Sequence, residues 1–325
     1  MVLVQAGASG TRPRPETSPS SRPSCATTFR IAFVADVAGL RSSVDAAGWR
    51  GVTQAVGTVA CAHADLALPA RPSEYLRTLQ AYTHDDLVIA GSFLLTEAVV
   101  EIARANPATH FVLVDPLVTL PALPNLQVLT FRSDQAAFLA GALAAIVTRT
   151  GVVAGVYGPD GAMDRSNRQG FERGARYVRP GVRVLGAYQP AGNAPYADPA
   201  WGAGQARAFI SQHADVIFGA GGTTGQGALL GAAQSGVACI NEDLAPSSDP
   251  SCVIATSVKF IDRGVRMAVA DAIAGQWQGG VQSLGMAQGA VALSLGTDRG
   301  LASDVRERLA IIAGLLAAGS ISLSP

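Results

Sequence analysis

Lys259 is the only lysine in the 325-residue chain, and every other strong base is an arginine. A lysine ammonium is a compact point charge with three donors, whereas an arginine guanidinium is a planar fork. The apolar run before Lys259, residues 253–258, is typical of a buried strand, so the lysine stands at a polar strand end. Such a lysine suits the oxygen atoms of a ligand or a carboxylate. The alternative is a surface lysine left over in an arginine-biased composition.

Other polar or glycine residues also follow short apolar runs, namely Asp36, Ser92, Asp115, Gly221 and Asn241. Ligands of open α/β sheets bind beyond the carboxyl ends of the strands, so we expect these residues to converge at one rim of each sheet. Gly222 extends the glycine turn, whose backbone can approach a ligand closely.

Tyr196 stands in a loop before a predicted helix, where its ring could stack on a flat ligand. The alternative is that the ring packs over the start of that helix, with Asp198 as N-cap and Pro199 as the first helical residue.

Catalytic motifs are missing from the sequence, which contains neither G-x-S-x-G nor H-E-x-x-H. The glycine stretch at 219–225 departs from the dinucleotide fingerprint at Thr224, and no G-K-[ST] follows it. Asp36 and Asp115 could act as paired carboxylates, but without a nucleophile they suit hydrogen-bond acceptors better. We therefore predict a binding protein that is not an enzyme and needs no metal or cofactor.

Composition limits the class of protein further. The net charge is zero and 49% of the residues are hydrophobic, which indicates a large core and argues against a nucleic-acid partner. The apolar run at 136–147 is too short to span a membrane. The length favours two domains.

Residues 1–29 differ from the rest of the chain because Pro, Ser, Thr and Arg dominate them, and we predict a disordered linker. The apolar start, Met1 to Ala8, resembles the tail of a secretory signal whose charged beginning is missing. This favours an extracytoplasmic protein, anchored to a membrane through a missing or truncated signal. Of the four cysteines, Cys239 and Cys252 could form a disulfide, as could Cys25 and Cys61, although buried free thiols are the preferred interpretation.

Strands and helices alternate from residue 29 onward, which predicts parallel sheets with right-handed crossovers. We expect strands at 31–35, 87–90, 111–114, 128–131, 152–156, 182–187, 216–218, 237–240, 253–258, 291–293 and 321–323. The expected helices cover 44–56, 94–105, 135–147, 166–178, 200–212, 227–235, 262–274 and 302–318. The predicted domains are a first lobe of 30–130 plus 258–285 and a second lobe of 131–257 plus 286–325.

Seven short segments, in order, resemble the basic membrane protein (PnrA-like) family of substrate-binding lipoproteins of ABC importers. They are IAFVADVAG at 31–39, DLVIAGSF at 86–93, FVLVD at 111–115, FLAG at 138–141, GFERG at 170–174, AGGT at 220–223 and TSVK at 256–259. The resemblance runs from about residue 30 to the end. It implies a type I periplasmic-binding fold, with two Rossmann-like lobes of parallel sheet joined by a three-segment hinge that closes over a ligand.

In that family a nucleoside base is stacked between two aromatic rings, and acidic residues with a lysine hold its polar groups. Asp36 and Asp115 match family aspartates, Lys259 matches the lysine, and Tyr196 stands where one stacking phenylalanine is expected. The resemblance thus implies a small polar ligand, of which nucleosides are one candidate, and a membrane permease as partner of a monomeric protein.

Three positions depart from the family pattern. Val44 replaces the other stacking phenylalanine, Asp45 replaces an asparagine, and Asn241 replaces the aspartate that contacts ribose. We therefore expect purine nucleosides to bind poorly unless another aromatic residue, such as Phe93 beside Ser92, takes the place of the missing ring. A ligand-sensing module for a signalling partner is the alternative function, and an enzyme of nucleoside metabolism is a weaker one.

Overall fold

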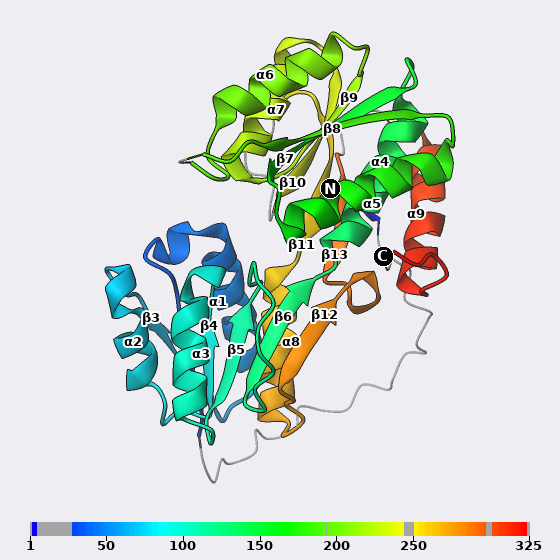
Figure 1. The fold of residues 1–325 in the computed structure, drawn as a ribbon. Helices are drawn as coiled ribbons and strands as arrows, with labels where there is room; N and C mark the ends of the chain where they lie inside the picture. Colours follow the sequence, from blue (N-terminus) through cyan, green and yellow to red (C-terminus); the bar gives the residue numbers. More distant parts are fainter. Residues whose placement is uncertain (1, 5–27, 193, 244–249, 297–300, 324–325) are drawn as a thin grey trace, which may run out of the picture. The chain divides into compact units, whose positions relative to one another are not determined.

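The chain forms two compact units in a computed structural model that describes residues 2–4, 28–192, 194–243, 250–296 and 301–323 (Figure 1). Unit 1 comprises Met1–Ala6, Arg132–Lys259 and Gly285–Pro325, and unit 2 comprises Gly7–Phe131 and Phe260–Leu284. Between residues 28 and 323 the chain passes from one unit to the other after Phe131, after Lys259 and after Leu284.

Unit 2 is built on a six-stranded sheet whose pairs are all parallel, in the order β12-β6-β5-β4-β2-β3. Its strands are β2 (Phe29–Val34), β3 (Ala62–Ala67), β4 (Leu87–Ala90), β5 (His110–Val114), β6 (Leu126–Phe131) and β12 (Gly280–Leu284). The central strand β4 is buried along its whole length, as expected for a parallel strand covered on both faces.

Helices cover both faces of the sheet in unit 2. They are α1 (Ser43–Val56), α2 (Tyr75–Ala81), α3 (Thr96–Ala105) and α8 (Ile261–Ile273), with short 3-10 turns η1 (Gly39–Arg41), η2 (Pro72–Glu74) and η3 (Phe93–Leu95). Helices α2 and α3 pack on one face through Leu79, Val99 and Ile102. Helices α1 and α8 pack against each other on the other face. Phe33 points to that face, opposite to its strand neighbours Ala32 and Val34, and its ring lies against Gly48 of α1.

Unit 1 contains a seven-stranded mixed sheet in the order β1-β13-β11-β10-β9-β7-β8. Its strands are β1 (Val2–Val4), β7 (Val152–Pro159), β8 (Arg183–Gln189), β9 (Val216–Gly219), β10 (Ala238–Asp243), β11 (Val253–Lys259) and β13 (Val291–Leu295). The pairs from β8 to β11 are parallel, whereas β13 runs antiparallel to both β11 and β1. The helices are α4 (Ser133–Val147), α5 (Ala162–Val178), α6 (Pro199–Ile210), α7 (Gly222–Gln234) and α9 (Ser303–Ala317), with one 3-10 turn, η4 (Met286–Gln288).

Several elements differ from the sequence-based expectation. Strands β3 and β12 and helix α2 were not predicted, because β3 and β12 are edge strands without a continuous aliphatic run and α2 has only seven residues. The prediction of a strand at 321–323 is wrong, since the described residues after α9 form no strand. Within the predicted linker 1–29, Val2–Val4 is extended and pairs with β13, while residues 5–27 lie outside the described part of the chain.

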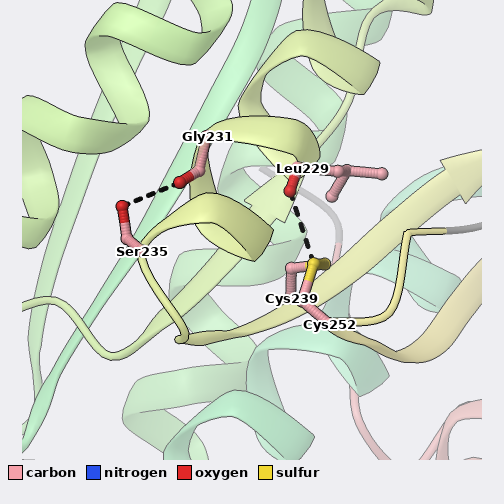
Figure 2. The surroundings of a disulfide bond; sticks show 5 residues. All are labelled: Leu229, Gly231, Ser235, Cys239 and Cys252. Atoms are coloured by element: carbon pink, nitrogen blue, oxygen red, sulfur yellow. Dashed lines mark hydrogen bonds between the residues drawn. A yellow bond between two sulfur atoms is a disulfide. The ribbon is translucent and has the colours of Figure 1, made fainter.

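Cys239 and Cys252 form a disulfide between the start of β10 and the residue before β11 (Figure 2). The preferred interpretation as free thiols is therefore wrong for this pair. The Sγ atom of Cys252 lies 3.4 Å from the carbonyl oxygen of Leu229 in α7, a packing contact because a disulfide sulfur carries no hydrogen. Cys61 is also disulfide-bonded, and Cys25 lies outside the described residues.

Removal of this disulfide should destabilise unit 1. The two cysteines are 13 residues apart, and closing a loop of this size stabilises a fold by about 3 kcal/mol. We expect the Cys239→Ala/Cys252→Ala variant to unfold at lower denaturant concentration than the wild type. Reductant should lower wild-type stability more than that of the variant, and an equal loss in both proteins would contradict the prediction.

Candidate functional site

Unit 1 has a pocket of about 190 Å³ at the carboxyl ends of its central strands. Its lining residues are Met163, Tyr196, Gly221, Gly222, Gln226, Glu242 and Lys259. Lys259 is the last residue of β11, and its ammonium nitrogen lies 3.8 Å from the sulfur of Met163. The backbone N–H of Gly221 donates to Oε2 of Glu242 at 3.4 Å. The pocket thus combines a carboxylate, an ammonium and an aromatic ring.

Two glycines shape one wall of this pocket. Gly221 (φ 90°) is the N-cap of α7, and Gly222 (φ 64°) follows it, so both occupy the left-handed region that favours glycine. A side chain at Gly221 would collide with the backbone of Gly158 in β7, and one at Gly222 would press on Tyr196. Helix α7 begins at Gly222, inside the glycine stretch and five residues before the predicted start at 227.

A hydrogen-bond network holds Tyr196 in an unusual backbone conformation, with φ 63°. Its N–H donates to Oε1 of Gln189 (2.9 Å), and its carbonyl accepts from the hydroxyl of Thr223 (3.1 Å). The buried hydroxyl of Thr224 also donates to Gln189, at 3.0 Å. Backbone strain of this kind is concentrated at ligand-binding sites. Asp198 is the N-cap of α6, as predicted, because its carboxylate accepts from the N–H of Trp201.

The ring of Tyr196 lies over Gly158, where a Cβ atom would approach Cε1 of the ring to 2.5 Å. Burial, followed by the charge of Asp164, raises the pKa of the Tyr196 phenol to about 12, so this hydroxyl stays protonated at neutral pH. Asp164, in the first turn of α5, is fully buried and accepts the N–H of Gly158 at 2.9 Å. The tyrosine is therefore a neutral ring with a fixed position.

Unit 2 carries a second cluster of polar groups at the end of β2. The carboxylate of Asp36 accepts from the N–H of Ala38 at 2.7 Å and from the hydroxyl of Ser92 at 3.2 Å. The N–H of Asp36 donates to Oδ2 of Asp45 at 3.2 Å, which brings two carboxyl groups together. Asp36, Asp45 and Ser92 are all buried. This cluster can accept hydrogen bonds from hydroxyl or amine groups.

Three further predicted residues of unit 2 lie at the same edge of the sheet. Asp115 follows β5 and has a positive φ of 49°, a conformation that is uncommon outside glycine. Phe93 begins η3 directly after Ser92, with 40% of its surface exposed. Val44 is half-buried in the first turn of α1, next to Asp45. The neighbouring order of β5, β4 and β2 places all three near one stretch of the rim.

The predicted residues thus fall into two groups, one in each unit. Tyr196, Gly221, Gly222 and Lys259 line one pocket of unit 1. Asn241 differs from its predicted place after a strand, because β10 continues to Asp243 and Asn241 lies within it, 4% exposed. Its neighbour Glu242 lines the pocket instead.

Sequence reasoning missed Glu242, Asp164, Met163 and Gln226. Glu242 could have been found because it places a carboxylate one residue after position 241, where the family has an aspartate. Asp164 could have been found as an acidic residue in the first turn of the helix after β7, as Asp45 is after β2.

The described part of the chain contains no cluster of metal-ligating side chains and no membrane-spanning helix. In the described ranges, no three His, Cys, Asp or Glu side chains are grouped so that they could hold a metal ion. None of the helices traced there is both long and apolar enough to cross a membrane.

Solved structures with the same fold include ABC transporter solute-binding proteins. One from Conexibacter woesei DSM 14684 aligns with a TM-score of 0.72 at 20% identity, covering 91% of this chain and 99% of the other. One from Aeropyrum pernix K1 aligns with a TM-score of 0.69 at 20% identity, covering 90% and 93%. A transcriptional activator of the comK gene from Bacillus halodurans aligns with a TM-score of 0.74 at 15% identity, covering 91% and 100%. The two α/β units therefore have the type I periplasmic-binding fold.

The sequence places the chain more narrowly within this class. Residues 44–310 match the family described as ABC transporter substrate-binding protein PnrA-like, and the chain belongs to this family of binding proteins rather than enzymes. Basic membrane protein A of Borreliella burgdorferi is 28% identical over 187 residues, which cover 56% of this chain and 54% of that protein. Basic membrane protein B of Borrelia garinii subsp. bavariensis is 27% identical over 219 residues, covering 64% and 62%. The chain thus spans about half to three fifths of the length of these curated relatives.

Proposed function

We propose that this protein is the extracytoplasmic solute-binding component of an ABC importer, which captures a small polar molecule and delivers it to a membrane permease. The observation that carries the proposal is the pocket of unit 1, where Tyr196, Glu242 and Lys259 meet at strand ends of a fold used for solute binding. Family membership supports the same role.

In unit 1 the groups proposed to contact a ligand are Tyr196, Glu242, Lys259 and the backbone of Gly221 and Gly222. In unit 2 the proposed groups are Asp36, Ser92, Phe93 and Asp115, with Val44 and Asp45 beside them. Buried Asn241 supports the strand that carries Glu242.

An oxidising compartment is consistent with the Cys239–Cys252 disulfide, because such bonds persist mainly in exported proteins. We propose that the protein acts as a monomer outside the cytoplasm and is held at the membrane by an N-terminal anchor.

Native mass spectrometry of gently purified protein tests the proposal through any small molecule that remains bound. We expect Tyr196→Ala and Glu242→Gln to lose most of the bound molecule, since each removes a contact from the pocket. Glu307→Gln, at an exposed position of α9, is the matched control and should retain it. Equal occupancy in all three variants would show that the ligand binds elsewhere.

A further inference from the structure

Two aspartates occupy equivalent places in the two units. Asp45 is the third residue of α1, the helix that follows β2, and Asp164 is the third residue of α5, the helix that follows β7. Each accepts a hydrogen bond from the backbone at the carboxyl end of the preceding strand. The N–H of Asp36 donates to Asp45 at 3.2 Å, and the N–H of Gly158 donates to Asp164 at 2.9 Å.

Both carboxyl groups are removed from water. Asp45 and Asp164 are 0% exposed, and each has one buried oxygen without a hydrogen-bond partner, Oδ1 of Asp45 and Oδ2 of Asp164. The carboxylate of Asp45 fits closely under Gly91, where a side chain would collide with Oδ1. A buried carboxyl group with an unsatisfied oxygen is costly to ionise, so this environment favours the protonated form.

Each aspartate also faces a second acid from another segment. Burial, and then the charge of Asp36, raises the pKa of Asp45 to about 7, and Tyr75 of α2 is the other titratable group beside this pair. Burial, and then the charge of Glu242, raises the pKa of Asp164 to about 6.

Other groups act on Asp164 from the elements packed around it. The hydroxyl of Tyr196 donates a hydrogen bond to Asp164, and this bond, the N–H of Gly158 and the positive charge of Lys259 all lower the pKa of Asp164 against the effects of burial and Glu242. Tyr157 of β7 also lies beside it. The balance is therefore set by two acids, one ammonium and two phenols.

The two aspartates hold groups of the candidate site. Asp45 fixes the backbone of Asp36, whose carboxylate binds Ser92. Asp164 fixes the backbone of Gly158, on which the ring of Tyr196 lies. Ionisation strengthens the hydrogen bond that each aspartate accepts from the backbone N–H, and it also sets the charge of Asp45 against that of Asp36 and the charge of Asp164 against that of Glu242.

We propose that Asp45 and Asp164 are equivalent positioning residues, one in each unit, which hold the ligand-facing end of the preceding strand through a backbone N–H, and that this hold changes when the aspartate gains or loses its proton. The inference rests on the proposed function, because the groups that the two aspartates position, Asp36, Ser92 and Tyr196, are those proposed to contact the ligand.

Amide NMR of the full-length protein without added ligand tests the proposal, with a titration from about pH 5 to about pH 9. We expect the ¹H–¹⁵N signal of Asp36 to shift with a midpoint near 7 and that of Gly158 with a midpoint near 6. Asp45→Asn should abolish the Asp36 transition and leave that of Gly158. Asp164→Asn should do the reverse, so each variant is the control for the other.

A wild-type protein whose Asp36 and Gly158 signals show no transition in this range would overturn the proposal without any variant. So would a transition that persists unchanged in the matching asparagine variant, because another group would then cause it. A merely structural role predicts lower stability in the variants but no selective loss of one transition. The titration needs no solute, so its failure leaves the transport role standing, and a protein that binds no solute leaves the titration result valid.

Discussion

Gly141→Ala should destabilise unit 1 by about 1–3 kcal/mol, because the substitution drives two helix backbones apart. Gly141 of α4 faces α5 so closely that a Cβ atom would collide with the carbonyl oxygen of Phe171. The contact is reciprocal, since a Cβ atom added at Gly174 of α5 would collide with the carbonyl oxygen of Phe138. Backbone atoms of a packed helix cannot rotate away as a flexible side chain can, so the helices must separate.

Denaturant unfolding of Gly141→Ala and Gly314→Ala measures this effect against a matched control. Gly314 lies in α9, and a Cβ atom there would have no neighbour within 4 Å. Alanine has the higher helix propensity, so Gly314→Ala should raise the free energy of unfolding by up to about 1 kcal/mol. Similar stability of the two variants would show that α4 and α5 can separate at little cost.

The alternation of strands and helices was predictable because buried parallel strands are continuous apolar runs. Strand β4 (Leu87–Ala90) has the predicted bounds, and β5 differs by one residue at its start. The edge strand β3 was not predictable in this way, since its sequence AHADLA mixes polar and small residues. It is held by pairing with β2 rather than by its own hydrophobicity.

The position of the candidate site at strand ends could also be predicted, whereas its chemistry could be predicted only in part. Lys259 and Tyr196 stood out by residue type and setting, and both line the pocket of unit 1. Glu242 did not, because the apolar run ends at Ile240 while the backbone of β10 continues to Asp243 in register with β11. The pairing of Asp45 with Asp36 depends on the path of η1 between them, which no local pattern specifies.

We expect purine nucleosides to bind this protein poorly, because the first turn of α1 presents Val44 where an aromatic ring would stack. Aromatic stacking contributes roughly 0.5–1.5 kcal/mol beyond the burial of area, or about a three- to tenfold change in affinity. Asn241 supplies no carboxylate, but its neighbour Glu242 brings one into the pocket of unit 1, so the expectation rests on the missing ring. Phe93, with 40% of its surface exposed at the rim of unit 2, is the aromatic residue of that unit best placed to compensate.

Calorimetric titration with guanosine and inosine, compared between wild type, Val44→Phe and Val44→Leu, tests this expectation. Val44→Phe adds a ring at the half-buried position beside Asp45, so purine affinity should rise about three- to tenfold. Val44→Leu adds a similar apolar contact without a π-face and should leave affinity nearly unchanged. A wild-type dissociation constant below about 1 μM, roughly −8 kcal/mol, would show that other residues already replace the missing ring. Equal gains in both variants would assign the effect to apolar contact and not to stacking, whereas no gain in either variant would place the base away from α1.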